Sequence, residues 1–176
     1  MKIRLSFLTL CAALAVSGCG KKETASATTP TDAGAPAATK TADNKAGEAK
    51  AGARVIEITA NDQMKFSVTT IEAKAGEQLK VVLTNIGTLP KEAMGHNWVL
   101  LKPGSDVAAF GAAASAARDK DYIPDALKDQ IVAHTALLGP KKSDEVTFTV
   151  PAAGEYPFLC SFPGHFALMK GTLTMK

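Results

Sequence analysis

Residues 155–175 read EYPFLCSFPGHFALMKGTLTM, in which two short runs of strand-forming residues flank a loop that contains Pro-Gly. The pattern predicts two strands and a connecting loop. Within ten residues the loop carries a thiol at Cys160, an imidazole at His165 and a thioether at Met169. This stretch therefore sets the strand pattern and also gathers three soft metal ligands.

From residue 54 onward the sequence continues this pattern of short apolar or alternating runs separated by Gly and Pro. We predict strands at Val55 to Thr59, Lys65 to Val68, Gln78 to Thr84, Asn97 to Leu101, Val146 to Val150, Glu155 to Cys160 and Gly171 to Met175. Ala73 to Glu77 and Pro151 to Gly154 are predicted turns. So many short strands favour a β-sandwich or barrel. Alanine-rich Asp106 to Lys120 predicts one excursion helix.

The N-terminus has the features of an export signal. Basic residues at Lys2 and Arg4 precede an apolar stretch, Leu5 to Val16, that is too short to span a membrane. The following Ser-Gly-Cys resembles the end of a bacterial lipobox, which implies cleavage before Cys19 and lipid on that cysteine. Residues 1–18 are therefore expected to be a lipoprotein signal peptide. A plain secretory signal that happens to contain a cysteine is the alternative.

Residues 20–53 contain no aromatic residue and no Val, Ile, Leu or Met. Such a segment cannot bury enough apolar area to offset its ordering entropy. We expect residues 19–53 to be a lipidated cysteine plus a disordered tether, with a mean reach of roughly 30 Å. Residues 54–176 are then the folded domain.

The charge and cysteine content exclude several classes of protein. The formal net charge is +3, but from Arg54 onward basic and acidic residues are equal in number. No basic excess therefore recruits nucleic acid. Removal of Cys11 with the signal and acylation of Cys19 leave Cys160 alone, so no disulfide forms. A lone thiol in an oxidising compartment indicates protection, which metal ligation provides.

A second imidazole comes from far upstream, at Gly95-His96-Asn97. Two histidines, one cysteine and a weak methionine form the trigonal set that copper electron-transfer sites use. A structural zinc site instead closes with four strong ligands. Thiol catalysis by Cys160 with a histidine base, and simple core packing of cysteine and methionine, are the other interpretations.

Two segments resemble the copper-binding segments of the azurins, which belong to the cupredoxin family. They are LPKEAMGHNWVL at residues 89–100 and CSFPGHFALMKGTLT at residues 160–174, and the similarity runs from about Arg54 to the end. Four residues between Cys160 and His165, and three between His165 and Met169, match the azurin loop. Plastocyanin, pseudoazurin and amicyanin have a shorter first gap, and rusticyanin and auracyanin a longer second one.

The resemblance implies an all-β, Greek-key cupredoxin sandwich or barrel of seven to eight strands with one excursion helix. It implies one copper ion that alternates between Cu(I) and Cu(II). Cys160, His96 and His165 would be the equatorial ligands, with Met169 sulfur and the Gly95 carbonyl as weak axial ligands. Glycine at this axial position is expected to let the backbone approach the metal closely.

Residues around the ligands also receive roles from the resemblance. Backbone amides near Asn97 and Phe162 would donate to the Cys160 sulfur, and the Asn97 side chain would join the two ligand segments. Pro163 has no amide hydrogen and withholds another donor. Electrons would enter through an exposed edge of His165. An apolar partner patch would surround that edge: Met64, Leu89, Ala93, Met94, Ala167 and Leu168.

The function implied is that of a type 1 (blue) copper protein, not an enzyme. It would pass single electrons between redox partners, such as c-type cytochromes or a reductase or oxidase, in the bacterial cell envelope. The lipid would hold it on a membrane facing the periplasm. Gly20 in place of aspartate slightly favours the outer membrane. The alternatives are a periplasmic copper chaperone or storage lipoprotein, a copper enzyme, and a surface adhesion or immune-facing role.

Several positions depart from the azurin pattern. Arg54 and Gly76 stand where azurins carry a disulfide, whose loss costs roughly 2–4 kcal/mol. Asn85 replaces a histidine that titrates in some azurins, and Phe166 replaces a small polar residue. Trp98, the one tryptophan, matches a buried core tryptophan, so we expect unusually blue emission that copper quenches.

Overall fold

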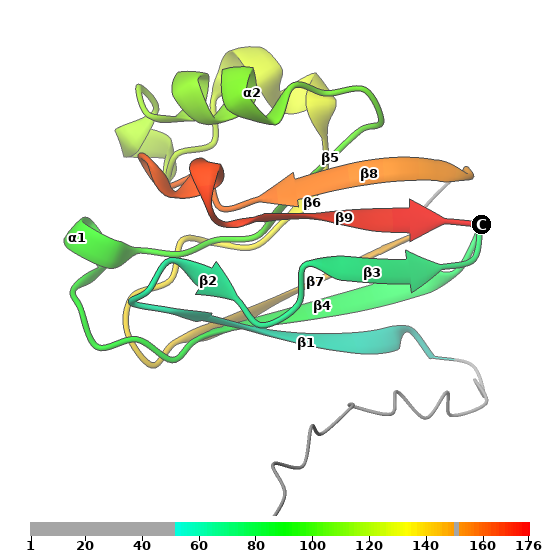
Figure 1. The fold of residues 1–176 in the computed structure, drawn as a ribbon, viewed down its shortest axis with the longest axis horizontal. Helices are drawn as coiled ribbons and strands as arrows, with labels where there is room; N and C mark the ends of the chain where they lie inside the picture. Colours follow the sequence, from blue (N-terminus) through cyan, green and yellow to red (C-terminus); the bar gives the residue numbers. More distant parts are fainter. Residues whose placement is uncertain (1–51, 150–151) are drawn as a thin grey trace, which may run out of the picture. The chain divides into compact units, whose positions relative to one another are not determined.

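The computed structural model of the chain describes residues 52–149 and 152–176. The predictions of a signal peptide, a lipidated cysteine and a tether lie outside these residues, as do the ends of the predicted strand at Val146 to Val150 and turn at Pro151 to Gly154. The described part forms two sheets with short helices around them (Figure 1).

Within the described residues, nine strands make up the two sheets. They are β1 (Arg54–Asn61), β2 (Lys65–Phe66), β3 (Thr70–Ala73), β4 (Gln78–Asn85), β5 (Val99–Leu101), β6 (Ile131–His134), β7 (Ser143–Thr149), β8 (Gly154–Leu159) and β9 (Lys170–Met175). The helices are α1 (Lys91–Met94) and α2 (Val107–Ala114), with 3-10 turns η1 (Arg118–Lys120), η2 (Asp125–Gln130) and η3 (His165–Ala167).

One sheet has the strand order β2-β1-β4-β7, and the other has the order β3-β9-β8-β5-β6. Two pairs are parallel, β1 with β4 and β3 with β9, while the remaining neighbours are antiparallel. Parallel pairing of strands from separate parts of the chain needs crossovers between the sheets. This connectivity produces the two-layer sandwich that the sequence predicted.

The core lies between the sheets because alternate strand residues point inward. In β4, Leu79, Val81 and Leu83 are fully buried while the residues between them are not. The Trp98 ring is also fully buried and stacks on Phe148 at a centroid distance of 5.8 Å. Each large apolar side chain buried in this way contributes about 1.5–3 kcal/mol.

All seven predicted strands are present with ends shifted by a few residues, and two more strands complete the sheets. The two additional strands are β3, which overlaps the start of a predicted turn at Ala73, and β6. Each has only four residues. So short a run carries too few alternations to be recognised, and pairing with β9 and β5 stabilises it.

The predicted helix at Asp106 to Lys120 is wrong in length. The helix α2 begins after Asp106, whose carboxylate caps the amides of Ala108 and Ala109, and it ends at Ala114. Beyond it the amides of Ala116 and Ala117 bond three residues back rather than four, which tightens the chain into 3-10 geometry. Helix α2 lies over the sheet that contains β8 and β5 (Figure 1).

Candidate metal centre

Strand pairing brings the two predicted ligand segments together. Strands β5 and β8 run antiparallel with Val99 opposite Leu159, so residues just before β5 lie beside residues just after β8. His96 comes before β5, where it forms an isolated bridge with Leu138, and Cys160 follows β8. The loop then returns to the same end of the sandwich as α1 (Figure 1).

The loop is shaped so that His165 turns back toward Cys160. Gly164 has φ +80°, in the left-handed region that glycine adopts without strain. The His165 amide donates to the Phe162 carbonyl at 3.0 Å, and the Met169 amide donates to the His165 carbonyl at 2.7 Å. The Cys160 amide donates to the Met169 carbonyl at 2.9 Å, which closes the loop at its base.

Three donor atoms converge in this way. The Cys160 Sγ lies 3.6 Å from His165 Nδ1 and 4.0 Å from His96 Nδ1, and the three ligand atoms are all within 4.8 Å of one another. Ligands at 2.0–2.3 Å from one ion, spread evenly in a plane, place sulfur and nitrogen about 3.8 Å apart. The spacing therefore fits a single metal ion between the three side chains.

The donor set distinguishes between metals. Among the described residues, no fourth His, Cys, Asp or Glu joins these three, so the site lacks the closed set of structural zinc. The Gly95 carbonyl lies 4.0 Å from the Cys160 sulfur. Met169 is fully buried in the same loop. Three strong ligands, with a carbonyl near the sulfur and a buried methionine in the same loop, match the preference of copper.

Burial raises the pKa of the Cys160 thiol to about 11. Hydrogen bonds from the backbone amides of Asn97 and Phe162 to the sulfur oppose this effect because they stabilise the thiolate. Without a metal, Cys160 is a neutral thiol at pH 7.

Burial also lowers the pKa of both histidines. The pKa of His165 falls to about 4, mainly through burial and secondarily through the nearby His96. The pKa of His96 is lowered by burial, while the Asn61 backbone and the Asp62 carboxylate partly oppose the shift. Both imidazoles are therefore neutral at pH 7, the state in which a metal binds them.

The two Nδ1 atoms face the sulfur, which leaves Nε2 of each ring directed away from the centre. His96 is fully buried, and a hydrogen bond to the Asn61 backbone partly offsets the burial of its ring. A partner on the far side of the ring fixes its orientation, which favours Nδ1 as the metal ligand.

Gly95 has a structural reason to be glycine in addition to the expected approach to a metal. Its φ of −69° is accessible to any residue, so no unusual conformation requires glycine. A Cβ at this position would stand 2.7 Å from the Lys91 carbonyl and 3.1 Å from Leu137 Cγ. Glycine is therefore needed so that α1 can pack closely before the first ligand, rather than by the approach of the metal alone.

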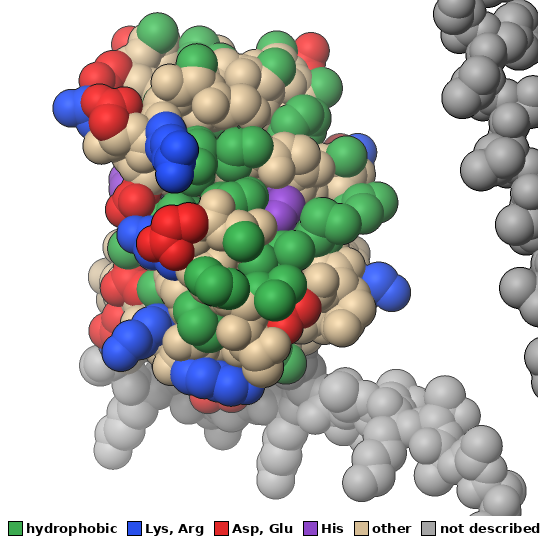
Figure 2. Space-filling view, turned by 90° about the vertical axis from the view of Figure 1, so that its left-hand side faces the viewer, with side chains coloured by type: hydrophobic (Ala, Val, Ile, Leu, Met, Phe, Trp, Pro, Cys, Tyr) green, Lys and Arg blue, Asp and Glu red, His purple; other side chains and the backbone are tan. Residues whose placement is uncertain are grey.

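His165 is less exposed than predicted, since only 3% of its surface is accessible. The aromatic ring of Phe162 covers it at a centroid distance of 4.6 Å. Of the six predicted patch residues, Leu89, Ala93, Ala167 and Leu168 are exposed, while Met64 and Met94 are half-buried. Figure 2 shows hydrophobic side chains gathered around a histidine on one face of the molecule.

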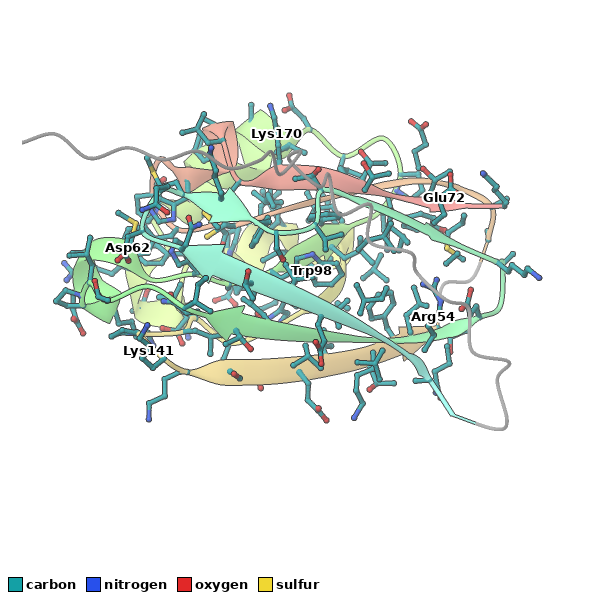
Figure 3. The ribbon with its side chains drawn as sticks, turned by 60° about the horizontal axis from the view of Figure 1, so that its bottom comes forward. Arg54, Asp62, Glu72, Trp98, Lys141 and Lys170 are labelled. Atoms are coloured by element: carbon teal, nitrogen blue, oxygen red, sulfur yellow. The ribbon has the colours of Figure 1, made fainter. Side chains whose placement is uncertain are left out.

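Two site residues were missed in the sequence. Ser161 hydrogen-bonds to the Asn97 side chain, and the Asp62 carboxylate accepts from the Thr88 amide at 2.8 Å and from the Thr88 hydroxyl at 2.9 Å. The Thr88 amide bond is the main reason that the pKa of Asp62 is lowered. Asp62 thus fixes the loop that leads to Leu89. Figure 3 shows Asp62 at the opposite end of the sandwich from Arg54.

Arg54, at one of the two positions where the resemblance implies a disulfide in azurins, joins separate chain segments through its side chain. Its Nε donates to Glu77 Oε1 at 2.5 Å, and its Nη2 donates to the Glu72 carbonyl at 2.7 Å. Gly76, the other position of that disulfide, has φ +79° in the turn before β4. The ion pair thus joins β1 to the turn before β4, and the hydrogen bond to the Glu72 carbonyl joins β1 to β3.

Comparison with known proteins identifies relatives with the same chemistry. A family model described as copper binding proteins, plastocyanin/azurin family, matches residues 53–176. The chain is 43% identical over 125 residues to an azurin from Pseudomonas denitrificans, covering 69% of this chain and 97% of that protein. It is 45% identical over 124 residues to an azurin from Bordetella pertussis, covering 68% and 82%.

Solved structures resemble the chain as well. Auracyanin A, a blue copper protein from Chloroflexus aurantiacus, is 33% identical with a TM-score of 0.64, covering 71% of this chain and all of that one. A reduced auracyanin from Roseiflexus castenholzii is 34% identical with a TM-score of 0.60, covering 71% and 99%. Both agree with the fold class predicted from the sequence.

Proposed function

The chain belongs to the plastocyanin/azurin family of copper-binding proteins, and we propose that it works as a lipid-anchored member of that family in the bacterial cell envelope. It is a blue copper protein that binds one copper ion and transfers single electrons. The observation that carries this function is the convergence of His96 Nδ1, Cys160 Sγ and His165 Nδ1 within 4.8 Å of one another in a buried site.

We propose that these three residues are the strong copper ligands, with Met169 and the Gly95 carbonyl as weak axial ones. Bound copper supplies one-electron chemistry between Cu(I) and Cu(II). These residues are buried, and their two segments are joined by hydrogen bonds, which would hold them in one arrangement as the ion changes its charge. A site that changes little on oxidation transfers electrons without a large structural cost.

The surroundings of Cys160 set how much charge its sulfur keeps. The amides of Asn97 and Phe162 donate to it, and Pro163 has no amide to add a third donor. Each amide stabilises the thiolate and withdraws charge from it. These donors therefore help to set the reduction potential of the centre.

Electrons are expected to enter through the accessible edge of His165, within the patch of exposed apolar residues. The described domain has equal numbers of basic and acidic residues, so charge gives no general steering toward one partner. A small apolar patch suits transient encounters that dissociate quickly. We propose redox proteins such as c-type cytochromes, or a reductase or oxidase, as partners.

The anchoring part of the proposal rests on residues 1–53 of the sequence. The Ser-Gly-Cys end of the signal supports lipid on Cys19, and the polar, Ala-rich segment to residue 53 supports a tether. Among residues 52–149 and 152–176, no helix has the length and apolarity needed to cross a membrane. We propose a periplasm-facing membrane, the outer one slightly favoured.

A copper chaperone or storage protein is not favoured. Such proteins exchange their ion readily, which open sites allow, whereas His96 and Cys160 have no accessible surface and His165 has 3%. The azurin relatives point to an electron carrier rather than an enzyme.

The optical and electron-paramagnetic-resonance spectra of the copper-loaded protein test the function. We expect an intense sulfur-to-copper band near 600 nm that disappears reversibly on reduction. Cys160→Ser should abolish the band. Survival of the band in that variant, or rapid transfer of Cu(I) to an acceptor without redox cycling, would contradict an electron carrier. For the anchor, Cys19→Ala should move the protein from the membrane fraction to the soluble fraction.

A further inference from the structure

Phe166, the residue after His165, packs its ring against helix α2 at Gly111. A Cβ at Gly111 would overlap Cγ and Cδ1 of that ring and would stand 2.9 Å from Phe166 Cβ. Carbon atoms do not approach so closely, so this position excludes every residue larger than glycine unless Phe166 moves. Glycine is a poor helix former, and its place within the alanine-rich helix is explained by this contact.

The helix is fixed on its other sides. Asp106 caps the amides of Ala108 and Ala109 at 2.8 and 3.0 Å. Phe110 and Ala114 are fully buried in the core. These contacts hold α2 against the sandwich. The space left by the missing side chain of Gly111, which the Phe166 ring fills, therefore has a fixed position.

The ring is coupled to the ligand through a short stretch of backbone. Phe166 and His165 share the turn η3, in which the Leu168 and Met169 amides both donate to the His165 carbonyl, at 3.0 and 2.7 Å. The side chain of Phe166 is only partly buried, so filling the core does not by itself explain its placement. A displacement of the ring would be passed directly to the His165 backbone.

We propose that Phe166 is a positioning residue for His165, and that its ring, seated in the gap at Gly111, holds the His165 imidazole beside Cys160. Helix α2 thereby becomes part of the frame of the metal centre. This inference rests on the proposed copper function, because it concerns the geometry of that site.

The first test measures the thermal unfolding of the copper-free protein. Alanine in place of glycine normally stabilises a helix, but Gly111→Ala should lower the folded-to-unfolded ratio about five- to thirtyfold because of the overlap. The double variant Gly111→Ala/Phe166→Ala should regain most of the loss, since the ring is gone. Ala112→Gly, an exposed exchange in the same helix, is the matched control for helix propensity.

The second test measures the copper-loaded protein. Phe166→Ala should shift the reduction potential and change the copper hyperfine splitting, because His165 is no longer held, whereas Ala112→Gly should leave both unchanged. If Gly111→Ala does not fold, Phe166→Ala decides the question alone, since it only removes atoms. A copper-free Gly111→Ala that melts above the wild type, or a Phe166→Ala centre identical to the wild type, would overturn the proposal. A wild type that never turns blue would instead overturn the copper function.

Discussion

Asn97 and Ser161 exchange two buried hydrogen bonds, each 2.8 Å long. The Asn97 side-chain amide donates to the Ser161 hydroxyl, and the Ser161 backbone amide donates to the Asn97 side-chain oxygen. The two residues directly follow His96 and Cys160, so this pair joins the two ligand segments at the metal centre. Residues that orient metal ligands in this way affect both affinity and potential.

Asn97→Ala should therefore destabilise the protein and disturb the copper site. Three side-chain hydrogen bonds are lost, the two with Ser161 and a longer one of 3.4 Å to the Asp121 carbonyl, and the buried amide of Ser161 is left without its partner. We expect a loss of about 2–4 kcal/mol in unfolding free energy. Denaturant titration measures the loss, and the potential should shift with it. Thr84→Ala, which breaks an exposed side-chain bond to Ser143, is the control that should change neither by much.

Copper uptake by the metal-free protein at pH 7 should release one proton. The pKa of Cys160 is raised to about 11, so its thiol must lose a proton to bind, whereas burial keeps the pKa of His165 at about 4 and lowers that of His96. Calorimetry in buffers of different ionisation enthalpy counts the protons. Release of two or more would show that a histidine is protonated in the metal-free state.

Acid should destabilise the copper-free protein through His165. Its pKa is about 4 in the folded protein against 6.5 for the ordinary group, so the unfolded chain binds the proton more tightly. The unfolding free energy is thus unaffected above pH 6.5 and falls as the pH drops from 6.5 to about 4. Chemical denaturation at several pH values measures this slope, which should be smaller in His165→Gln.

The hydrogen bonds and ion pair of Arg54 should contribute to the unfolding free energy and so replace part of what a disulfide at this position would contribute. Arg54→Ala is expected to cost about 1–2 kcal/mol at pH 7, from a half-exposed ion pair and one hydrogen bond to a carbonyl. The Arg54 side chain is the main cause that lowers the pKa of Glu77, so the ion-pair share is present above pH 4.5 and fades as Glu77 becomes protonated.

Thermal melts of the wild type and of Arg54→Ala at pH 7 and pH 3 test this expectation. The difference between them should shrink at pH 3 without vanishing, since the Glu72 carbonyl still accepts its bond. Lys176→Ala, which breaks an exposed ion pair with Glu72, should have almost no effect. A difference that grows at low pH would contradict the account.

Trp98 should emit at unusually short wavelength, because its ring is fully buried and its Nε1 has no hydrogen-bond partner within the described part of the chain. Phe148 and Phe158 surround it at centroid distances of 5.8 and 5.4 Å. Removal of copper should increase the emission, and unfolding should shift it to the red. Emission at the wavelength of an exposed indole in the folded protein would contradict this packing.

The sequence predicted the strands that have a clear alternation, such as β4, and placed most of their ends within a few residues. The strands β3 and β6 were missed, because each has only four residues and is stabilised by hydrogen bonds to its neighbouring strand, β9 or β5. The sequence overestimated α2, since alanine-rich composition continues past Ala114 while the hydrogen-bond pattern does not. Local propensity predicts an element, but tertiary contacts decide where it ends.

The ligand types and their spacing were present in the sequence, because the chemistry of Cys160, His165 and Met169 and the length of their loop are local properties. Only the tertiary structure decided that His96, 64 residues before Cys160, lies 4.0 Å from its sulfur. Only the tertiary structure, likewise, buries Cys160 and His165 and so shifts their pKa values, and only it packs the Phe166 ring against Gly111. Such proximities depend on which strands pair and how helices pack over them, and no local pattern encodes either.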